Sequence, residues 1–204
     1  MAIGWDAVER VLLERAPARP GEAFASRAAV ALILRDGVAG IELLFIRRAE
    51  HPRDPWSGQM AFPGGRSEPG ETDLVATAMR ETLEEVGIDL HREAGLLGAL
   101  DEVRAMARMR PVDLAISPFV FRLRGDPTPE PGPEVTSVHW IPLASLLASG
   151  ARSTFDYAHE GETLQFPCLR LDELVIWGLT YRMFMSFGGR LLGPGAAAAS
   201  GAGG

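Results

Sequence analysis

Residues 62–88 read FPGGRSEPGETDLVATAMRETLEEVGI and combine a Pro-Gly-Gly corner with an acidic, apolar-periodic segment. Glycine lacks Cβ, so this corner permits backbone conformations and close approaches that other residues resist. The segment predicts a helix that begins after an N-cap at Thr72 and ends at Gly87, the position where a C-terminal glycine is expected. Between these two residues, apolar side chains recur at helical spacing.

Projection at about 100° per residue gives the predicted helix two faces. The face predicted to pack on a core comprises Val75, Ala78, Met79, Thr82, Leu83 and Val86. Glu81, Glu84 and Glu85 share a neighbouring arc, because residues three and four apart are surface neighbours. Crowded carboxylates repel each other, and a hard divalent cation such as Mg²⁺ or Mn²⁺ would offset that repulsion through oxygen ligands. A Glu-rich helix is more often a solvated face, but the glycine corner and the adjoining Arg80 favour the metal site.

These residues resemble the Nudix box, G-x5-E-x7-R-E-U-x-E-E-x-G-U, where U is apolar. Gly65, Glu71 and residues 80–88 (RETLEEVGI) supply every fixed position. Two departures are visible, because eight residues rather than seven separate Glu71 from Arg80, and Thr82 stands at a usually aliphatic position. The longer spacing leaves the role of Glu71 open.

The resemblance implies an α/β protein with the Nudix fold, a mixed β-sheet sandwiched between α-helices. It also implies hydrolysis of a diphosphate linkage in a nucleoside diphosphate derivative, with Mg²⁺ or Mn²⁺ as cofactor. By resemblance, the metal ligands would be the carbonyl of Gly65 and the carboxylates of Glu81, Glu84 and Glu85. Such ions neutralise charge on phosphate and lower the pKa of an attacking water.

The remaining catalytic roles divide between one arginine and several acids. By resemblance, Arg80 is the box arginine, which would orient the helix carboxylates rather than attack the substrate. The attacking water would lose its proton to Glu84 or to an acid from a loop outside the box. Glu134, beside a proline-rich loop, is the first such candidate, and Asp101 and Glu102 are alternatives.

Substrate contacts are expected from arginines near the glycine corner, since guanidinium groups pair well with phosphate oxygens. The predicted set is Arg47, Arg53 and Arg66. Arg48, beside the same loops that lead to the corner, is a further candidate. The stretches 43–47 (LLFIR) and 58–65 (GQMAFPGG) resemble the upstream signature of the Nudix subgroup that cleaves coenzyme A. This chain departs from that signature at two positions. Arg48 stands where the subgroup usually has serine, and Asp54 stands where it usually has arginine.

Coenzyme A or a related adenine nucleotide is therefore the first substrate hypothesis. ADP-ribose or a dinucleotide is the alternative within the same enzyme class. A non-catalytic nucleotide-binding Nudix module is the alternative of another class, but its usual sign is erosion of the box carboxylates, which are intact in this chain. Whether the chain forms a homodimer is left open by the sequence.

Composition limits the other classes of protein. The net charge of −7 over 204 residues argues against general binding to nucleic acid or to acidic membranes. No apolar run reaches the roughly 18 residues of a membrane span, and no signal peptide is evident. The single cysteine, Cys168, excludes an internal disulfide and fits the reducing cytoplasm. The four histidines lack zinc-ligand spacing.

The rest of the chain predicts one domain at residues 26–191, preceded by a helix and connector (1–25) and followed by a disordered tail (192–204). Strands are expected at 28–34, 41–46, 59–62, 96–103, 114–123 and 135–141, and helices at 5–15, 142–147 and 174–187. Residues 154–169 predict a hairpin. The aromatic residues Phe155, Tyr157, Trp177, Tyr181 and Phe184 belong either to the core or to a slot for a base.

Overall fold

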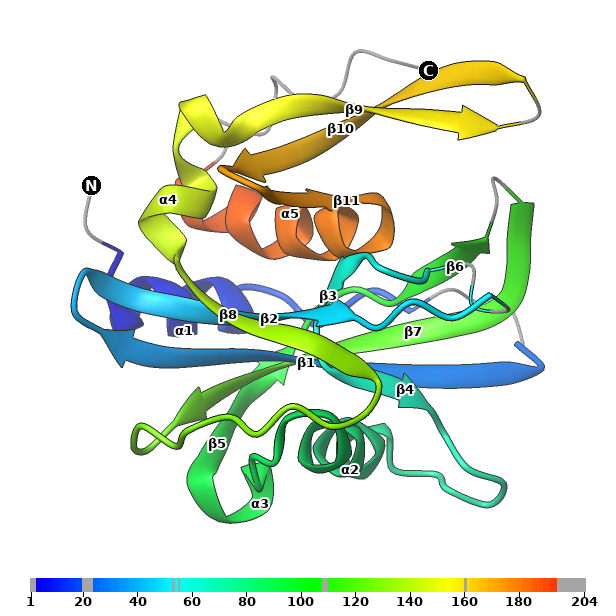
Figure 1. Cartoon of the computed structure of the whole chain (residues 1–204). Helices are drawn as coiled ribbons and strands as arrows, with labels where there is room; N and C mark the ends of the chain where they lie inside the picture. The colour runs from blue at the N-terminus through cyan, green and yellow to red at the C-terminus, as the bar shows by residue number, and fades with distance from the viewer. Residues whose placement is uncertain are drawn as a thin grey trace.

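The computed structural model describes residues 3–19, 24–52, 54, 56–107, 110–159 and 161–193 (Figure 1). Its helices are α1 (Trp5–Leu13), α2 (Leu74–Val86), α3 (Leu90–Glu93), α4 (Leu143–Leu147), the 3₁₀ turn η1 (Ser149–Ala151) and α5 (Gly178–Leu192). Its strands are β1 (Ser26–Gly37), β2 (Gly40–Arg48), β3 (Met60–Ala61), β4 (Gly64–Arg66), β5 (Ala94–Ala99), β6 (Val103–Ala107), β7 (Arg110–Leu123), β8 (Val135–Pro142), β9 (Arg152–His159), β10 (Glu162–Leu171) and β11 (Leu174–Trp177).

The larger sheet has the strand order β3-β2-β1-β7-β5, with β4 added to β1, β6 to β7 and β8 to β2. The pair β1–β7 is parallel and the other pairs are antiparallel, so the sheet is mixed. The predicted hairpin of residues 28–34 and 41–46 is confirmed, because β1 and β2 pair through Gly37 and Gly40. The continuous apolar runs of both strands fit a sheet that is covered on its two faces.

Helices cover both faces of this sheet, as Figure 1 shows, with α2 and α3 on one side and α1 and α5 on the other. Alternate residues of one strand enter different cores, because successive side chains point to opposite faces. Leu32 and Leu34 of β1 join the core beneath α1 and α5, and the intervening Ile33 joins the core beneath α2. The predicted architecture, a mixed sheet between helices, is therefore confirmed.

The N-terminal helix α1 ends at Leu13, two residues before the predicted end, and buries Val8 and Val11 in the core shared with α5. The C-terminal region forms a separate sheet in the order β11-β10-β9, which includes the predicted hairpin. The prediction that residues 174–177 are helical is wrong. They form β11, which pairs with β10, and α5 begins only at Gly178. A short apolar run fits a strand or a helix equally well, and pairing with β10 decides between them.

The tail predicted at 192–204 lies outside the described residues, apart from Leu192 and Gly193. The domain limits at residues 26 and 191 stay predictions. Among the described residues, no helix is long and apolar enough to cross a membrane.

Candidate active site

Helix α2 carries the three box glutamates and has well-formed ends. Its N-cap is Asp73 rather than the predicted Thr72, and the Asp73 carboxylate accepts a hydrogen bond of 2.9 Å from the Val75 N–H. Its C-terminal residue Gly87 is confirmed as the cap, with φ of 71° in the left-handed region that favours glycine. The caps fix where the helix starts and stops, and therefore which glutamates reach the corner.

The buried face of α2 differs from the predicted one. Its buried residues are Thr77, Ala78, Thr82, Glu85 and Val86. Leu83, predicted to face the core, is 49% exposed, whereas Glu85 is only 5% exposed. The helix is thus rotated so that an acid, and not a leucine, faces the sheet.

The glycine corner explains why a carboxylate is tolerated there. Gly64 has φ of 151°, and a Cβ at this residue would overlap the backbone of Ala29 and Val30, on which β4 pairs. The Gly64 N–H donates a hydrogen bond of 2.9 Å to Oε2 of Glu85. A Cβ on Gly65 would overlap the carboxylate of Glu81. Two glycines therefore let the β4 backbone meet two carboxylates of α2.

The carboxylates gather more negative charge than their neighbours offset. Burial raises the pKa of Glu85 to about 7, although the Gly64 hydrogen bond and the Arg48 guanidinium, 3.7 Å away, work in the opposite direction. Burial also raises the pKa of Glu81, against the effect of Arg80, and Glu84 and Glu134 raise it further. Arg48 and Arg80 thus do not fully offset the effect of burial and of the neighbouring acids on these two carboxylates.

Arg80 holds several parts of the box together. It donates a hydrogen bond of 2.9 Å to Glu81 and longer ones, of 3.4 Å, to Glu84 and Glu71. It also donates 3.1 Å to the backbone carbonyl of Arg66. Glu71 therefore reaches the box arginine in spite of the longer spacing. A turn in which the Glu71 N–H donates to the Glu68 carbonyl takes up residues between the corner and the helix.

A cavity of about 520 Å³ opens between these carboxylates and the C-terminal helix. Its polar end is lined by Glu81, Glu84, Glu85, Glu134, Gly64, Gly65, Arg66, Arg48 and Asp54. The structure thus brings together both predicted base candidates, Glu84 and Glu134, with the whole predicted metal set. Its other end is lined by apolar side chains from the sheet and from α5.

Glu134 reaches the cavity because the proline-rich loop before it closes on the end of α2. The Glu130 N–H donates to the carbonyl of Val86 at 2.8 Å, and the Gly132 N–H donates to the carbonyl of Glu85 at 2.9 Å. The last carbonyls of a helix have no partner within the helix, so the loop satisfies them. This docking brings the exposed side chain of Glu134 beside the box.

The predicted substrate arginines are placed differently. Arg66 lines the cavity, Arg47 is not among its lining residues, and Arg53 lies outside the described residues. Arg48, the further candidate named beside that set, lines the cavity and donates two hydrogen bonds, of 3.1 and 2.8 Å, to Oδ2 of Asp54. The two departures from the coenzyme A signature therefore form one ion pair. Neither residue alone signalled that pairing in the sequence.

The alternative bases Asp101 and Glu102 are not among the residues that line the cavity. Asp101 pairs with Arg15, and its carboxylate accepts from the Ala18 N–H at 2.7 Å. Glu102 pairs with Arg27 and Arg19, and the Ser117 hydroxyl donates 2.6 Å to it. These contacts tie the segment before β1 to the sheet.

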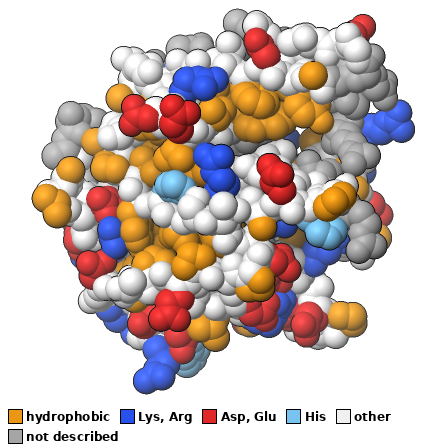
Figure 2. Space-filling view, viewed as in Figure 1, with side chains coloured by type: hydrophobic (Ala, Val, Ile, Leu, Met, Phe, Trp, Pro, Cys, Tyr) orange, Lys and Arg blue, Asp and Glu red, His pale blue; other side chains and the backbone are white. Residues whose placement is uncertain are grey.

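The aromatic residues also separate into groups. Phe184 is fully buried in the core beneath α1 and α5, and Tyr181 packs against that core. Phe155, Tyr157 and Trp177 cluster on the outer sheet, with Phe155 and Trp177 stacked at 4.5 Å. On the face drawn in Figure 2, hydrophobic side chains gather in the upper half, where Figure 1 places β9–β11. None of the five predicted aromatic residues lines the carboxylate cavity.

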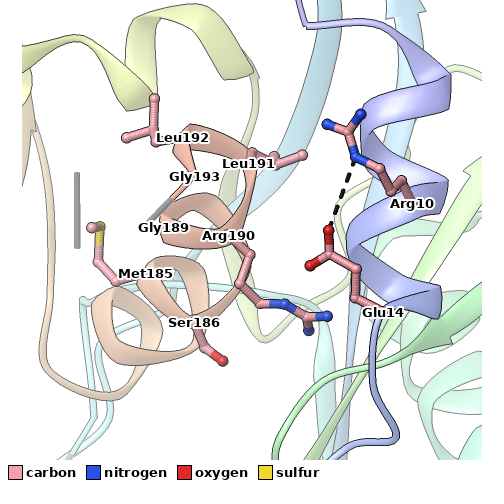
Figure 3. Close-up of a pocket in the computed structure, with 9 residues that line it drawn as sticks. All are labelled: Arg10, Glu14, Met185, Ser186, Gly189, Arg190, Leu191, Leu192 and Gly193. Carbon is pink, nitrogen blue, oxygen red and sulfur yellow. Dashed lines mark ion pairs between the residues drawn. The ribbon is translucent and has the colours of Figure 1, made fainter. Parts of the chain in front are cut away.

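A second cavity, of about 630 Å³, lies between α1 and α5 (Figure 3). Arg10, Glu14 and Arg190 are its charged lining residues, and Arg10 and Glu14 form an ion pair of 4.0 Å. It holds one carboxylate, so its side chains do not resemble a divalent-cation site.

The donor set at the first cavity suits Mg²⁺ or Mn²⁺ by type, because hard cations prefer carboxylate and carbonyl oxygens. The surplus negative charge around buried Glu85, and the glycine that leaves room beside Glu81, fit a cation as well. Within the described residues, no three His, Cys, Asp or Glu side chains form a ready-made cluster. Glu81 instead pairs with Arg80, and Glu85 accepts from Gly64.

Known proteins resemble this chain in sequence. Residues 25–159 match the model of the NUDIX domain. The uncharacterized Nudix hydrolase NudL of Photorhabdus laumondii is 30% identical over 140 residues, covering 68% of this chain and 71% of that protein. An uncharacterized protein of Schizosaccharomyces pombe is 45% identical over 109 residues, 52% of this chain and 33% of that protein. The chain thus spans about a third of the length of this yeast relative.

The fold is also similar to that of a solved structure. A MutT/nudix family protein from Enterococcus faecalis gives a TM-score of 0.56 at 18% identity, over 85% of this chain and 64% of that chain. The architecture and the box are those of a Nudix hydrolase domain. The chain belongs to the Nudix family.

Proposed function

We propose that this chain is a divalent-metal-dependent pyrophosphohydrolase that cleaves a diphosphate linkage in a nucleoside diphosphate derivative. The observation that carries the proposal is the cavity in which three glutamates of α2 and Glu134 meet the Gly64–Gly65 corner. A structural acidic face would be solvated. Here one of the acids is 5% exposed and accepts a backbone hydrogen bond at the corner.

Each residue has a role in this proposal. Glu81 and Glu85, with Glu84 and the Gly65 carbonyl, would hold Mg²⁺ or Mn²⁺. Such an ion, when bound, offsets charge on the phosphate oxygens and acidifies water. Arg80 would position the carboxylates through its contacts to Glu81 and Glu84.

The chemical step is hydrolysis. The oxygen of a water forms a bond to one phosphorus, the bond from that phosphorus to the bridging oxygen breaks, and the bridging oxygen leaves with the other phosphate. A carboxylate accepts the water's proton. Glu84 and Glu134 suit this role, since both line the cavity and both are exposed, so a proton taken up there can pass to solvent.

Coenzyme A or a related adenine nucleotide is our first choice of substrate. The upstream signature supports it, and Arg48 and Arg66 place guanidinium groups at the polar end of the cavity. ADP-ribose or a dinucleotide is the alternative. A nucleotide-binding module without catalysis is the alternative of another class, although Glu81, Glu84 and Glu85 are all present in this chain. The buried free thiol of Cys168 fits the cytoplasm as the compartment, and a homodimer stays a prediction.

A substrate screen tests the proposal. Wild type is incubated with coenzyme A, ADP-ribose and dinucleotides under Mg²⁺ and then Mn²⁺, and the products are identified. We expect 4′-phosphopantetheine and adenosine 3′,5′-bisphosphate from coenzyme A, because the bond from one phosphorus to the bridging oxygen is broken. The variant Glu85→Gln should lose activity, and Glu173→Gln, an exposed acid far along the chain, should keep it. Binding without turnover of any compound would favour the module instead.

A further inference from the structure

The carboxylate cavity has two chemically different ends. Its apolar end is defined by Trp56, Met60, Phe62, Ile116, Leu179 and Met183, which line the cavity and belong to one hydrophobic cluster or pack against it. None of these side chains carries a charge. Moving an anion into such surroundings is costly without a partner, so this end suits a group that is uncharged and mostly apolar.

Two elements beyond the family match shape this end. The match to the NUDIX domain ends at residue 159, whereas Leu179, Thr180 and Met183 belong to α5. The start of α5 is fixed by β11, which pairs with β10 from Leu171↔Leu174 to Cys168↔Trp177. The C-terminal sheet therefore holds the first turn of α5 against the cavity.

The side chains at the apolar end of the cavity have little freedom to rearrange. Met183 is 4% exposed and packs in the core beneath α1 and α5. On the other side, the Trp56 indole N–H donates a hydrogen bond of 3.0 Å to the Met106 carbonyl, which holds the ring in place. A group bound here would meet a preformed apolar surface, which lowers the ordering cost of binding.

We propose that Leu179 and Met183 of α5 are specificity residues that contact an uncharged, mostly apolar group attached to the diphosphate. This inference rests on the proposed hydrolysis for the identity of the anionic part. It adds that substrates are selected by the organic group beside the diphosphate. A nucleobase and a pantetheine-type arm share this chemistry, and the experiment below distinguishes them.

The test uses Leu179→Ser, with Met185→Ser as matched control. Both residues are half-buried on α5, but Met185 lines the cavity between α1 and α5 and not the carboxylate cavity (Figure 3). Unfolding temperatures of both variants are measured first. We expect Leu179→Ser to raise KM roughly tenfold with little change in kcat, as losing an apolar contact does. Met185→Ser should leave KM unchanged.

Truncated substrates identify the group that contacts Leu179. In one, a methyl group replaces the arm beyond the diphosphate, and in the other it replaces the adenosine. The truncation that removes the KM penalty of Leu179→Ser marks the group that contacts residue 179. Equal KM values for wild type and Leu179→Ser on intact substrate would overturn the inference. A KM penalty that persists on both truncated substrates would also overturn it.

A binding measurement keeps this inference separate from the proposed function. A coenzyme A analogue with a methylene group in place of the bridging oxygen is titrated into each protein by calorimetry. If wild type hydrolyses nothing, the proposed function fails. Weaker binding of the analogue to Leu179→Ser than to Met185→Ser would still support contact between α5 and the apolar group. Binding of equal strength to wild type and both variants, or binding to none of them, contradicts it.

Discussion

At the scale of the residue, Glu85 and not the expected Leu83 faces the sheet from α2. Glu85 accepts from the Gly64 backbone, and Leu83 is turned out to solvent. Exposing Leu83 and burying a carboxylate both cost stability. The corner glycines and the nearby Arg48 lower that cost, and the cost that is left fits the binding role proposed for this helix face.

The identity of the proton acceptor can be tested directly, because Glu84 and Glu134 come from different elements. We expect the variant that removes the acceptor to lower kcat on the order of 10²- to 10⁴-fold. The other variant should have a smaller effect. The measurement is steady-state hydrolysis by Glu84→Gln and Glu134→Gln at saturating Mg²⁺. Wild-type kcat in both variants would exclude both residues.

The Arg48–Asp54 pair gives a second prediction at this scale. Asp54 orients Arg48 through two hydrogen bonds, and Arg48 lies 3.7 Å from Glu85. Asp54→Asn should loosen the guanidinium and reduce kcat/KM roughly tenfold, as the loss of a supporting partner does. The exposed Asp113→Asn serves as control and should match wild type. An Asp54→Asn enzyme with wild-type kcat/KM would show that Arg48 acts without this support.

Sequence reasoning predicted which of these residues lie together better than it predicted their orientation. The box motif predicted the acids, Arg80 and the glycine corner, all of which the structure brings together. Periodicity could not place Leu83, because helical phase does not reveal which arc meets the sheet. The sequence analysis named Arg48 but missed its ion pair with Asp54, which lies in a loop that the fold brings near.

At the scale of the element, the short strand β4 connects the corner to the sheet. It pairs with β1 from Ala28↔Arg66 to Val30↔Gly64. Gly64→Ala would force a side chain into the left-handed region and against the backbone of Ala29.

We expect this variant to lower the free energy of unfolding by about 2 kcal/mol or more, because backbone strain and overlap combine. Activity should fall as well. The control is Gly95→Ala in β5, where a Cβ meets no atom within 4 Å and the backbone is not left-handed. Urea unfolding of both variants is the measurement. Equal midpoints would show that the corner can relax.

The elements themselves were largely predictable, with two exceptions. The strand predicted at residues 96–103 is interrupted at residues 100–102, between β5 and β6, and residues 174–177 form a strand and not a helix. The strands around residues 28–34, 41–46, 114–123 and 135–141 were found, because apolar runs between turn residues are a strong local signal. The apolar character of residues 174–177 suits a helix as well as a strand, so the sequence predicts a helix there. Their pairing with β10 is a tertiary contact and has no local signature.

At the scale of the whole molecule, α1 and the segment after it are tied to the domain by charge as well as by packing. The Asp101 carboxylate accepts hydrogen bonds from Arg15 and from the Ala18 N–H. These hydrogen bonds, that of Arg15 first, hold the pKa of Asp101 below its ordinary value of 3.8. The stabilisation is therefore fully present above pH 3.8 and is lost as the pH falls through the lowered pKa.

Asp101→Asn should thus destabilise the protein at pH 7, and the difference from wild type should shrink as the pH falls below about 3.8. Denaturant midpoints of wild type and variant across this range are the measurement, with Asp113→Asn as the exposed control. A difference that stays constant with pH would mean that Asp101 contributes by packing and not by charge.

The overall architecture was predicted mainly by the family motif, whereas the way the C-terminal region packs was not. The Nudix box implied a mixed sheet between helices, and the chain has it. The sequence predicted the hairpin at residues 154–169, but neither the third strand β11 nor the position of α5 beside the carboxylate cavity. That arrangement depends on contacts between segments far apart in the sequence.

The measurement that tests the central claim most directly is titration of Mn²⁺, followed by its electron paramagnetic resonance signal. Wild type is compared with the double variant Glu81→Gln and Glu85→Gln, after circular dichroism has shown that both are folded. The account predicts saturable binding to wild type and loss of that binding in the double variant. Equally tight binding to both proteins, or no binding to wild type at saturating Mn²⁺, would contradict it.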